Sequence, residues 1–308
     1  MRAFLFPGQG SQAVGMGAAL AGARRPARDV FDEVDEALGQ NLFRLMREGP
    51  DEELKLTENA QPAIMAHSLA VLRTMGVPLV EVASFVAGHS LGEYAALCAA
   101  GSFDLSTTAK LLKLRGQAMQ RAVPVGKGAM AALLGADLAL AEKIARTASE
   151  GEVCTVANDN DPSQVVISGA KAAIDRAIAL AKEMGAKRAI PLPVSAPFHC
   201  PLMEPAAEAM RDALSYVLVE EPVVPVFANV TAQPQTDPDT IRNQLVEQVT
   251  GMVRWRESVA NMFDAGVHEF VEIGGKVLGP MVKRIVPDAT VASIITIEDV
   301  EALAKEIA

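Results

Sequence analysis

The sequence is poor in the features that mark secreted, membrane-spanning and nucleic-acid-binding proteins. Its 308 residues include only three cysteines (Cys98, Cys154 and Cys200), an odd number without the spacing of metal ligands. No uninterrupted apolar stretch reaches the roughly 18 residues of a membrane span, and no signal-peptide pattern is present. The net charge of −10 disfavours a general nucleic-acid binder. We therefore expect a cytoplasmic protein with no metal site, no membrane contact and no nucleic-acid partner.

The order of the expected elements indicates an α/β fold in two parts. With 50% hydrophobic residues, the chain can bury a large core. Strands alternate with helices in 1–126 and 194–308, which favours a large α/β-hydrolase-like domain whose mostly parallel sheet is covered on both faces. Residues 127–193 have the order β-α-β-β-α-β, which predicts a small inserted ferredoxin-like domain.

The expected boundaries follow from hydrophobic periodicity and breakers. In the large domain we expect strands at 2–6, 82–87, 223–228, 267–273 and 290–295, and helices at 26–39, 41–47, 61–75, 91–100, 106–122, 201–217, 239–249, 255–265, from 276 and at the C-terminus. In the small domain we expect strands at 129–135, 152–157, 164–169 and 187–192, and helices at 137–149 and 170–184. Gln61 and Pro62 are expected to open the 61–75 helix, and Ser106 to cap the 106–122 helix.

The segment 88–92, Gly-His-Ser-Leu-Gly, matches the G-x-S-x-G nucleophile elbow. A short buried strand precedes it and a helix follows, so Ser90 is expected on a sharp turn with its hydroxyl exposed. The flanking residues are glycines because a Cβ would crowd that turn. The free N–H groups at the start of the helix could stabilise an oxyanion beside the serine. On this pattern alone, an ordinary strand–turn–helix stays open.

A second glycine-rich turn, Gly8-x-Gly10-x-x-Ala13, nearly matches a dinucleotide-binding fingerprint. That fingerprint requires a second strand about 20 residues later, ending in an acidic residue that holds the ribose. Residues 26–39 show the pattern of an amphipathic helix instead. We therefore reject the dinucleotide-binding interpretation.

A serine nucleophile needs a base, and the chain offers four histidines. His67 lies in an apolar helical pattern typical of a core residue, and His268 precedes a strand as an edge residue. His89 adjoins the serine but points away from it, which favours a supporting role. His199 lies in a proline-rich loop where the chain leaves the small domain, a position that can face a cleft. His199 is therefore the predicted base.

The third member of a hydrolase triad is missing in its usual form. An α/β-hydrolase carries an acid between its serine and its histidine in chain order. The carboxylates in that interval that we considered are interpreted as caps or turn residues; they are Asp104, Asp137, Asp159 and Asp161. This gap favours a relative of the hydrolases with a different third residue.

Arg115 lies at the edge of the apolar stripe of the 106–122 helix. A guanidinium turned partly inward needs a carboxylate or phosphate partner. A surface arginine whose stem covers apolar side chains stays open as the alternative.

Six stretches distributed over most of the chain carry a family resemblance. They are Phe6–Gln12, Gly88–Tyr94, Arg115-Gly116, Gln164–Gly169, Pro193–Cys200 and Lys276–Leu278. In this order they resemble malonyl-CoA:acyl carrier protein transacylase, whose fold also has an inserted ferredoxin-like domain. Two segments depart from the family pattern: the turn at Gly274-Gly275-Lys276 is one residue shorter, and residues 249–255 lack the more common aromatic and proline.

The resemblance implies malonyl transfer from malonyl-CoA to the phosphopantetheine thiol of acyl carrier protein, which supplies fatty acid synthesis without a bound cofactor. It implies that Ser90 is the acylated nucleophile, His199 its base, and Gln248 a neutral residue that helps to hold the histidine. The backbone N–H groups of Gln9 and Leu91 would form the oxyanion hole.

The resemblance also implies the residues that bind the substrate. Arg115 would hold the malonyl carboxylate through a bidentate pair. Phe198 would narrow the acyl pocket. Asn158 and Asn160 would lie in a loop facing the cleft, although a turn of the small domain stays open for both.

Two other functions stay open. A serine hydrolase or thioesterase would release the free acid, and a non-catalytic carrier-protein-binding module would form no serine adduct. CoA phosphates and an acidic carrier protein need basic surface, and the candidates are Lys187-Arg188, Arg254 with Arg256, and Lys283-Arg284. We expect a monomer.

Overall fold

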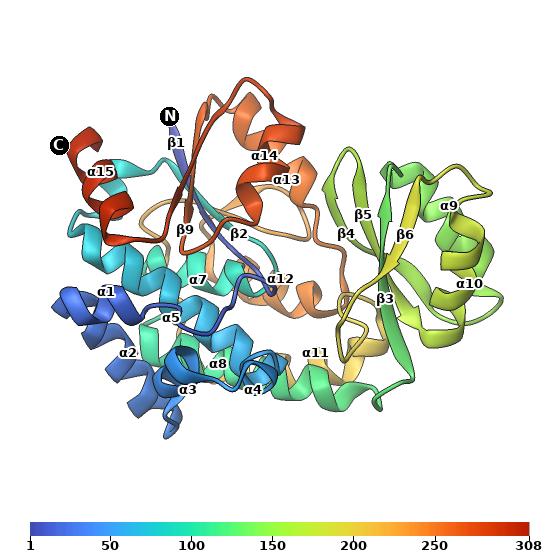
Figure 1. Ribbon diagram of the computed structural model, residues 1–308, viewed down its shortest axis with the longest axis horizontal. Helices are drawn as coiled ribbons and strands as arrows, with labels where there is room; N and C mark the ends of the chain where they lie inside the picture. The colour runs from blue at the N-terminus through green and yellow to red at the C-terminus, as the bar shows by residue number, and fades with distance from the viewer. Residues whose placement is uncertain (308) are drawn as a thin grey trace.

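The computed structural model describes residues 1–307 and contains two units, each built around its own sheet (Figure 1). The large unit carries both ends of the chain and a six-stranded sheet. The small unit, coloured green to yellow, carries a four-stranded sheet with two helices on its outer side. The α/β class and the inserted unit are confirmed.

The elements of the large unit come from the two ends of the chain. Before the small unit they are β1 (Arg2–Phe6), α1 (Ala18–Ala23), α2 (Arg25–Leu38), α3 (Leu42–Glu48), α4 (Asp51–Leu54), α5 (Thr57–Met75), α6 (Leu79–Val82), β2 (Phe85–Gly88), α7 (Leu91–Ala99) and α8 (Leu105–Ala122). After it they are the 3₁₀ helix η1 (Pro201–Met203), α11 (Glu204–Ser215), β7 (Val226–Phe227), β8 (Pro234–Gln235), α12 (Pro238–Thr250), α13 (Trp255–Asp264), β9 (Glu269–Ile273), α14 (Leu278–Ile285), β10 (Thr290–Ile294) and α15 (Ile297–Ile307).

The large sheet has the order β10-β9-β1-β2-β7-β8, and its neighbouring strands are parallel except for β7 and β8. Side chains of β1 alternate between two apolar cores: Phe4 and Phe6 face one, Ala3 and Leu5 the other. Both faces are therefore covered, as a mostly parallel sheet requires. Because Phe6 pairs with Gly88, the loops that follow β1 and β2 meet at one edge of the sheet.

The small unit consists of β3 (Gly128–Leu134), α9 (Leu138–Ser149), β4 (Cys154–Asp161), β5 (Gln164–Ala170), α10 (Lys171–Ala181) and β6 (Arg188–Pro191). Its strands are antiparallel in the order β4-β5-β3-β6. Leu133, Ile144 and Ile174 belong to a core of its own. The predicted β-α-β-β-α-β order is confirmed, while the boundaries at 127 and 193 stay predictions.

Strand β4 extends four residues beyond its predicted end, to the junction with the large unit. Asn158 and Asn160 therefore lie in a strand, so the loop and the turn expected for them were both wrong. The strand continues because its end pairs with β5 on one side, and Asn158 forms a parallel bridge with Val253 of the large unit on the other. This pairing satisfies backbone groups that a turn would have left to solvent.

Two buried carboxylates fasten the end of β4 to the large unit. Asp159 and Asp161 are 2% and 0% exposed. Asp159 pairs with Arg256 of α13 at 2.8 Å, and Asp161 pairs with Arg284 of α14 at 2.8 Å. Asp161 also accepts from the Ser163 N–H at 2.9 Å, as the expected turn residue would, whereas Asp159 is not the turn or cap residue that was expected. Each buried charge is retained with a partner.

One expected helix start and one expected helix cap were wrong. Helix α5 begins at Thr57, and Pro62 lies inside it, where its missing N–H removes a single helical hydrogen bond. Helix α8 is capped by Asp104, whose side chain accepts a hydrogen bond from the Thr107 N–H at 2.6 Å. Asp104 lies at the N-cap position and Ser106 does not, so the aspartate takes this role.

The remaining differences concern short elements. The strand expected at 82–87 begins only at Phe85, as β2, and Val82 ends the helix α6. The helix expected at 201–217 divides into η1 and α11. The antiparallel strand β8 and helices α1 and α4 were not expected. Within residues 1–307, no helix combines the length and apolarity needed to cross a membrane.

Candidate active site

Ser90 lies on a sharp turn between β2 and α7, as the elbow pattern predicts. Its backbone has φ 56° and ψ −111°, a conformation that L-residues adopt only under constraint. Asn229 supplies the constraint: its Oδ1 accepts from the Ser90 N–H at 2.7 Å, and its Nδ2 donates to the Gly88 carbonyl at 2.7 Å. The amide side chain thus fastens both ends of the turn.

The two glycines of the elbow are required by close packing. A Cβ on Gly88 would lie 1.9 Å from the carbonyl carbon of Gly92. A Cβ on Gly92 would lie 2.2 Å from the Phe6 carbonyl oxygen at the end of β1. Any side chain at these positions would displace the turn from the sheet.

The Ser90 hydroxyl is hydrogen-bonded to His199. Its Oγ lies 2.7 Å from Nε2, and Nδ1 of the same ring lies 2.9 Å from the backbone carbonyl oxygen of Gln248. Because a carbonyl only accepts, we assign the ring proton to Nδ1, which leaves Nε2 free to accept the serine proton. Burial, and then the nearby charge of Arg115, lower the pKa of His199 to about 3. The imidazole is therefore neutral, as a base must be.

Gln248 holds His199 through its backbone and contacts other groups through its side chain. It lies in the last turn of α12, where carbonyls have no partner within the helix. Its Nε2 donates to the Ser90 carbonyl at 3.0 Å and to Glu93 Oε2 at 2.7 Å. Its Oε1 accepts from Arg115 Nη2 at 2.8 Å. The neutral acceptor expected for the histidine is thus a main-chain oxygen.

Arg115 points into the protein, so the surface alternative was wrong. It is 1% exposed, and burial lowers its pKa. Its Nη atoms donate to Gln61 Oε1 at 2.8 Å, to Gln248 Oε1 at 2.8 Å and to Ser90 Oγ at 3.1 Å. Its Nε has no hydrogen-bond partner among the described residues, and no carboxylate there lies within 4.0 Å of it. A buried cation with neutral partners only is suited to an anionic ligand.

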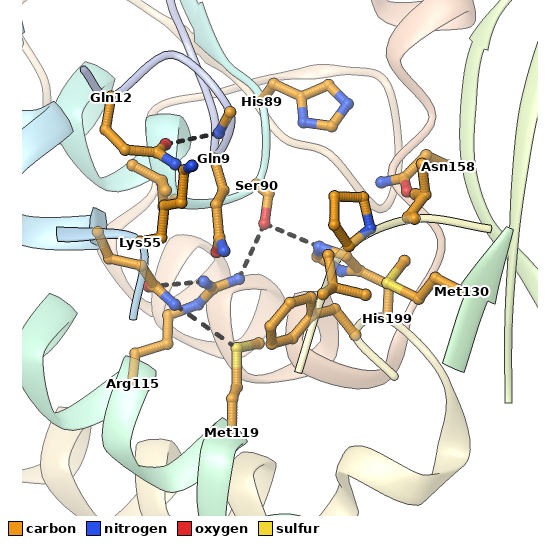
Figure 2. Close-up of a pocket in the computed structure, with 17 residues that line it drawn as sticks. Gln9, Gln12, Lys55, His89, Ser90, Arg115, Met119, Met130, Asn158 and His199 are labelled. Carbon is orange, nitrogen blue, oxygen red and sulfur yellow. Dashed lines mark hydrogen bonds between the residues drawn. The ribbon is translucent and has the colours of Figure 1, made fainter. Parts of the chain in front are cut away.

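These groups open into a cavity of about 460 Å³ at the junction of the two units. Figure 2 shows Ser90 between His199 and Arg115, with Gln9 on one side and Asn158 on the other. The predicted residues that line the cavity are Gln9, Ser90, Leu91, Arg115, Asn158, Phe198 and His199. Asn160 is not among them: its Oδ1 lies 2.8 Å from His89 Nε2. It therefore joins the small unit to the elbow without lining the cavity.

The other three histidines occupy the places expected of them. His67 is buried in α5, and burial lowers its pKa to about 4. His268 is exposed before β9 and packs edge-on against Phe263. The His89 side chain points away from Ser90, toward Asn160 and Trp255. None of the three contacts the Ser90 hydroxyl.

Several residues of the site were not found from the sequence. Lys55, Gln61, Met119 and Met130 line the cavity, and Glu93 and Asn229 lie beneath the nucleophile. Glu93 stands inside the 88–94 motif and could have been noticed there. Asn229 has no local signal, because its contact with Ser90 joins positions 139 residues apart.

A strained serine on an α/β sheet, paired with a neutral histidine, defines a protein of the serine-nucleophile class. Within that class, this chain belongs to the acyl transferase domain family, which matches residues 3–289. Within residues 1–307, no group of three or more His, Cys, Asp or Glu side chains is placed to hold a metal ion.

The relatives define the branch of that family. The malonyl CoA-acyl carrier protein transacylase of Haemophilus influenzae is 46% identical over 294 residues, which is 95% of this chain and 94% of the relative. The crystal structure of an acyl-carrier-protein-S-malonyltransferase from Bartonella henselae is 50% identical, with a TM-score of 0.97 over 99% of both chains. A malonyl-transacylase solved in complex with its type II PKS acyl-carrier protein is 40% identical, with a TM-score of 0.96 over 99% of this chain and 99% of that one.

Proposed function

We propose that this chain transfers a malonyl group from malonyl-CoA to the phosphopantetheine thiol of an acyl carrier protein, through a malonyl ester of Ser90. One observation carries the proposal. The Ser90 Oγ lies within hydrogen-bond distance of both the His199 Nε2 and the Arg115 guanidinium, at 2.7 and 3.1 Å. Nucleophile, base and carboxylate-binding group therefore meet at one point.

In the first half-reaction the Ser90 hydroxyl gives its proton to His199 Nε2 while Oγ attacks the malonyl thioester carbonyl. The tetrahedral intermediate collapses, the carbon–sulfur bond breaks, and the departing CoA sulfur takes the proton back from His199. The Gln248 carbonyl keeps the proton on Nδ1 and stabilises the imidazolium that forms. Malonyl-Ser90 and free CoA result.

The second half-reaction runs the same steps in reverse order with a new thiol. The phosphopantetheine thiol gives its proton to His199 as its sulfur attacks the ester carbonyl. The bond to Oγ breaks, and Oγ takes the proton from His199. The free enzyme is restored and no atom is gained or lost, so the kinetics are expected to be ping-pong.

The backbone N–H groups of Gln9 and Leu91 are proposed to hold the oxyanion of each intermediate. Leu91 is the first residue of α7, so its N–H has no partner within the helix and lies at the positive end of the helix dipole. Gln9 lies in the loop after β1, beside the elbow, and lines the same cavity. Donors fixed by the fold need little reorganisation when negative charge develops.

Arg115 is proposed to select malonyl among acyl groups by a bidentate pair with its free carboxylate. Its position beside Oγ suits an acid group only one methylene away from the thioester carbonyl. Phe198 lines the cavity, where it would limit the acyl group to an unbranched chain. Asn158 lines the opposite side and would contact the substrate. Asn160 is proposed to support the site through His89.

The acidic carrier protein requires basic surface outside the cavity. Of the candidate positions, Arg254, Arg256 and Arg284 pair with acidic residues of the chain itself. Lys187 and Arg188 are exposed at the start of β6 and are proposed as contacts for the carrier protein. We further propose that the chain acts as a cytoplasmic monomer, uses no bound cofactor, and supplies fatty acid synthesis.

Steady-state kinetics with malonyl-CoA and phosphopantetheinylated carrier protein test this function. Parallel double-reciprocal lines, with malonyl-carrier protein as the main product, are expected. Release of free malonate as the main product would indicate a thioesterase. Carrier-protein binding without any turnover would indicate a non-catalytic module, and either result would contradict the transferase.

A further inference from the structure

Glu93 is a buried carboxylate beneath the nucleophile that the mechanism above does not use. It lies in the first turn of α7, three residues after Ser90, and is 3% exposed. Burial raises the pKa of its carboxyl to about 7. Such a group is costly to bury without partners, and the partners it has lead to the active site.

The Glu93 carboxylate determines how the amide of Gln248 is turned. Gln248 Nε2 lies 2.7 Å from Glu93 Oε2 and 3.0 Å from the Ser90 carbonyl oxygen, and both oxygens accept hydrogen bonds. Gln248 Oε1 must then face Arg115 Nη2, which only donates, at 2.8 Å. The opposite orientation would place an NH₂ group against the guanidinium.

Gln248 is also the residue whose backbone carbonyl accepts from His199 Nδ1. Holding its side chain therefore holds the end of α12 that carries this carbonyl. The second donor to Glu93 Oε2 is the Asn229 N–H, at 3.0 Å. Asn229 in turn fastens the Ser90 turn. One carboxylate oxygen thus connects to the elements that hold nucleophile, base and carboxylate-binding arginine.

We propose that Glu93 is a positioning residue that takes the place of the missing triad acid without contacting the histidine itself. It orients Gln248, and Gln248 orients both His199 and Arg115. The inference rests on the proposed function, because its effect is read in malonyl transfer to Ser90. Glu93 has the chain order of a hydrolase triad acid, between serine and histidine, but it lies on a helix one turn after the serine and reaches the histidine only through a glutamine.

Two substitutions separate the role of the acceptor oxygen from that of the carboxylate charge. Glu93→Gln keeps an oxygen where Oε2 accepts both hydrogen bonds, whereas Glu93→Ala removes it. The readout is the single-turnover rate of Ser90 malonylation per folded molecule, from quenched-flow samples weighed as intact protein. We expect Glu93→Ala to slow this step by about 10- to 100-fold, as loss of a hydrogen bond to a charged group implies, and Glu93→Gln by less than about 5-fold.

A double-mutant cycle with Gln248→Ala distinguishes positioning from a merely structural loss. If Glu93 acts through Gln248, the double variant should be no slower than the slower single variant, within about 2-fold. Asp137→Ala is the matched control: it removes the N-cap of α9 in the small unit and should lower stability without changing the malonylation rate of folded protein.

Three outcomes would overturn the inference. They are an unchanged rate in Glu93→Ala, equal losses in Glu93→Ala and Glu93→Gln, and losses that multiply in the double variant. Each is read against a wild-type chain that is malonylated at Ser90. A wild-type chain that takes up no malonyl group would instead contradict the proposed function, so the two failures are distinguishable.

Discussion

Arg115 Nη2 donates a hydrogen bond to the Ser90 Oγ at 3.1 Å. The group proposed to bind the carboxylate therefore contacts the nucleophile directly. A malonyl group held at Arg115 would have its thioester carbonyl beside Oγ, whereas an acetyl group would have nothing to pair with the buried charge. In the proposed mechanism, selection of the substrate and attack on it would both depend on this contact.

Replacing Arg115 by alanine should change the choice of acyl group. We expect kcat/KM for malonyl-CoA to fall by about 10²- to 10³-fold, because a buried charge-assisted pair is lost. Acetyl-CoA should be used at least as well as before. Arg115→Lys keeps the charge but not the planar fork, so it should recover only part of the loss. Full malonyl selectivity in the alanine variant would show that another group binds the carboxylate.

The pH profile of acylation should lack the acid limb that histidine usually gives. The pKa of His199 is lowered from 6.5 to about 3, so the ring stays unprotonated as the pH falls through 6.5. Since kcat/KM reports the free enzyme, it should show no loss of base between pH 8 and about 5. In kcat the limb should lie higher, because bound malonyl neutralises Arg115, one cause of the lowered pKa. A fall in kcat/KM centred near pH 6.5 would contradict this assignment.

The dependence of the free energy of unfolding on pH should include a contribution from the protonation of His67. Burial lowers its pKa from 6.5 to about 4, so the unfolded chain binds the proton more tightly than the folded one. Its contribution is complete above pH 6.5 and is lost as the pH falls toward 4, by roughly 3 kcal/mol in the free energy of unfolding. His67→Leu should flatten the stability curve in this window. The free energy of unfolding is measured by urea unfolding at several pH values from 4 to 7. If its dependence on pH were the same in His67→Leu as in the wild type, the assignment would be contradicted.

The two units should be held together by the ion pair between Asp161 and Arg284. Asp161 is fully buried, so Arg284→Ala leaves a buried carboxylate without its cation. We expect a loss of about 1–3 kcal/mol in the free energy of unfolding, reduced from the fully buried case because Arg284 is partly exposed. Arg211→Ala is the control, since its pair with Glu204 spans 3.8 Å at the surface. Equal losses in both variants would contradict a role at the junction.

Features of the structure that depend on residues close together in the sequence could be predicted from the sequence. The elbow at Ser90 needs two glycines, and each glycine is required by a backbone atom nearby, so the motif has a physical basis that short-range pattern captures. The order of strands in the small unit follows from alternation and turns. Arg115 borders the apolar stripe of its helix, so the sequence offered the inward orientation as one of two that stayed open.

What the sequence hides is set by contacts between distant segments. Asn158 and Asn160 were expected in a loop or turn, but the end of β4 pairs with β5 and forms a bridge with Val253, which lies 95 residues further along the chain. Pro62 lies inside α5, although pattern alone favours proline in the first turn of a helix. Glu93 was not predicted as a site residue, because a triad acid is sought at the end of a strand. Glu93 lies on a helix and is proposed to act through Gln248.

The most direct test of the account is the intact mass of the protein after brief mixing with malonyl-CoA, beside Ser90→Ala as control. We expect the wild type to gain the mass of one malonyl group and to lose it faster to phosphopantetheinylated carrier protein than to water. The Ser90→Ala variant should gain nothing. An unchanged wild-type mass, or an equal gain in the Ser90→Ala variant, would contradict a malonyl-Ser90 intermediate.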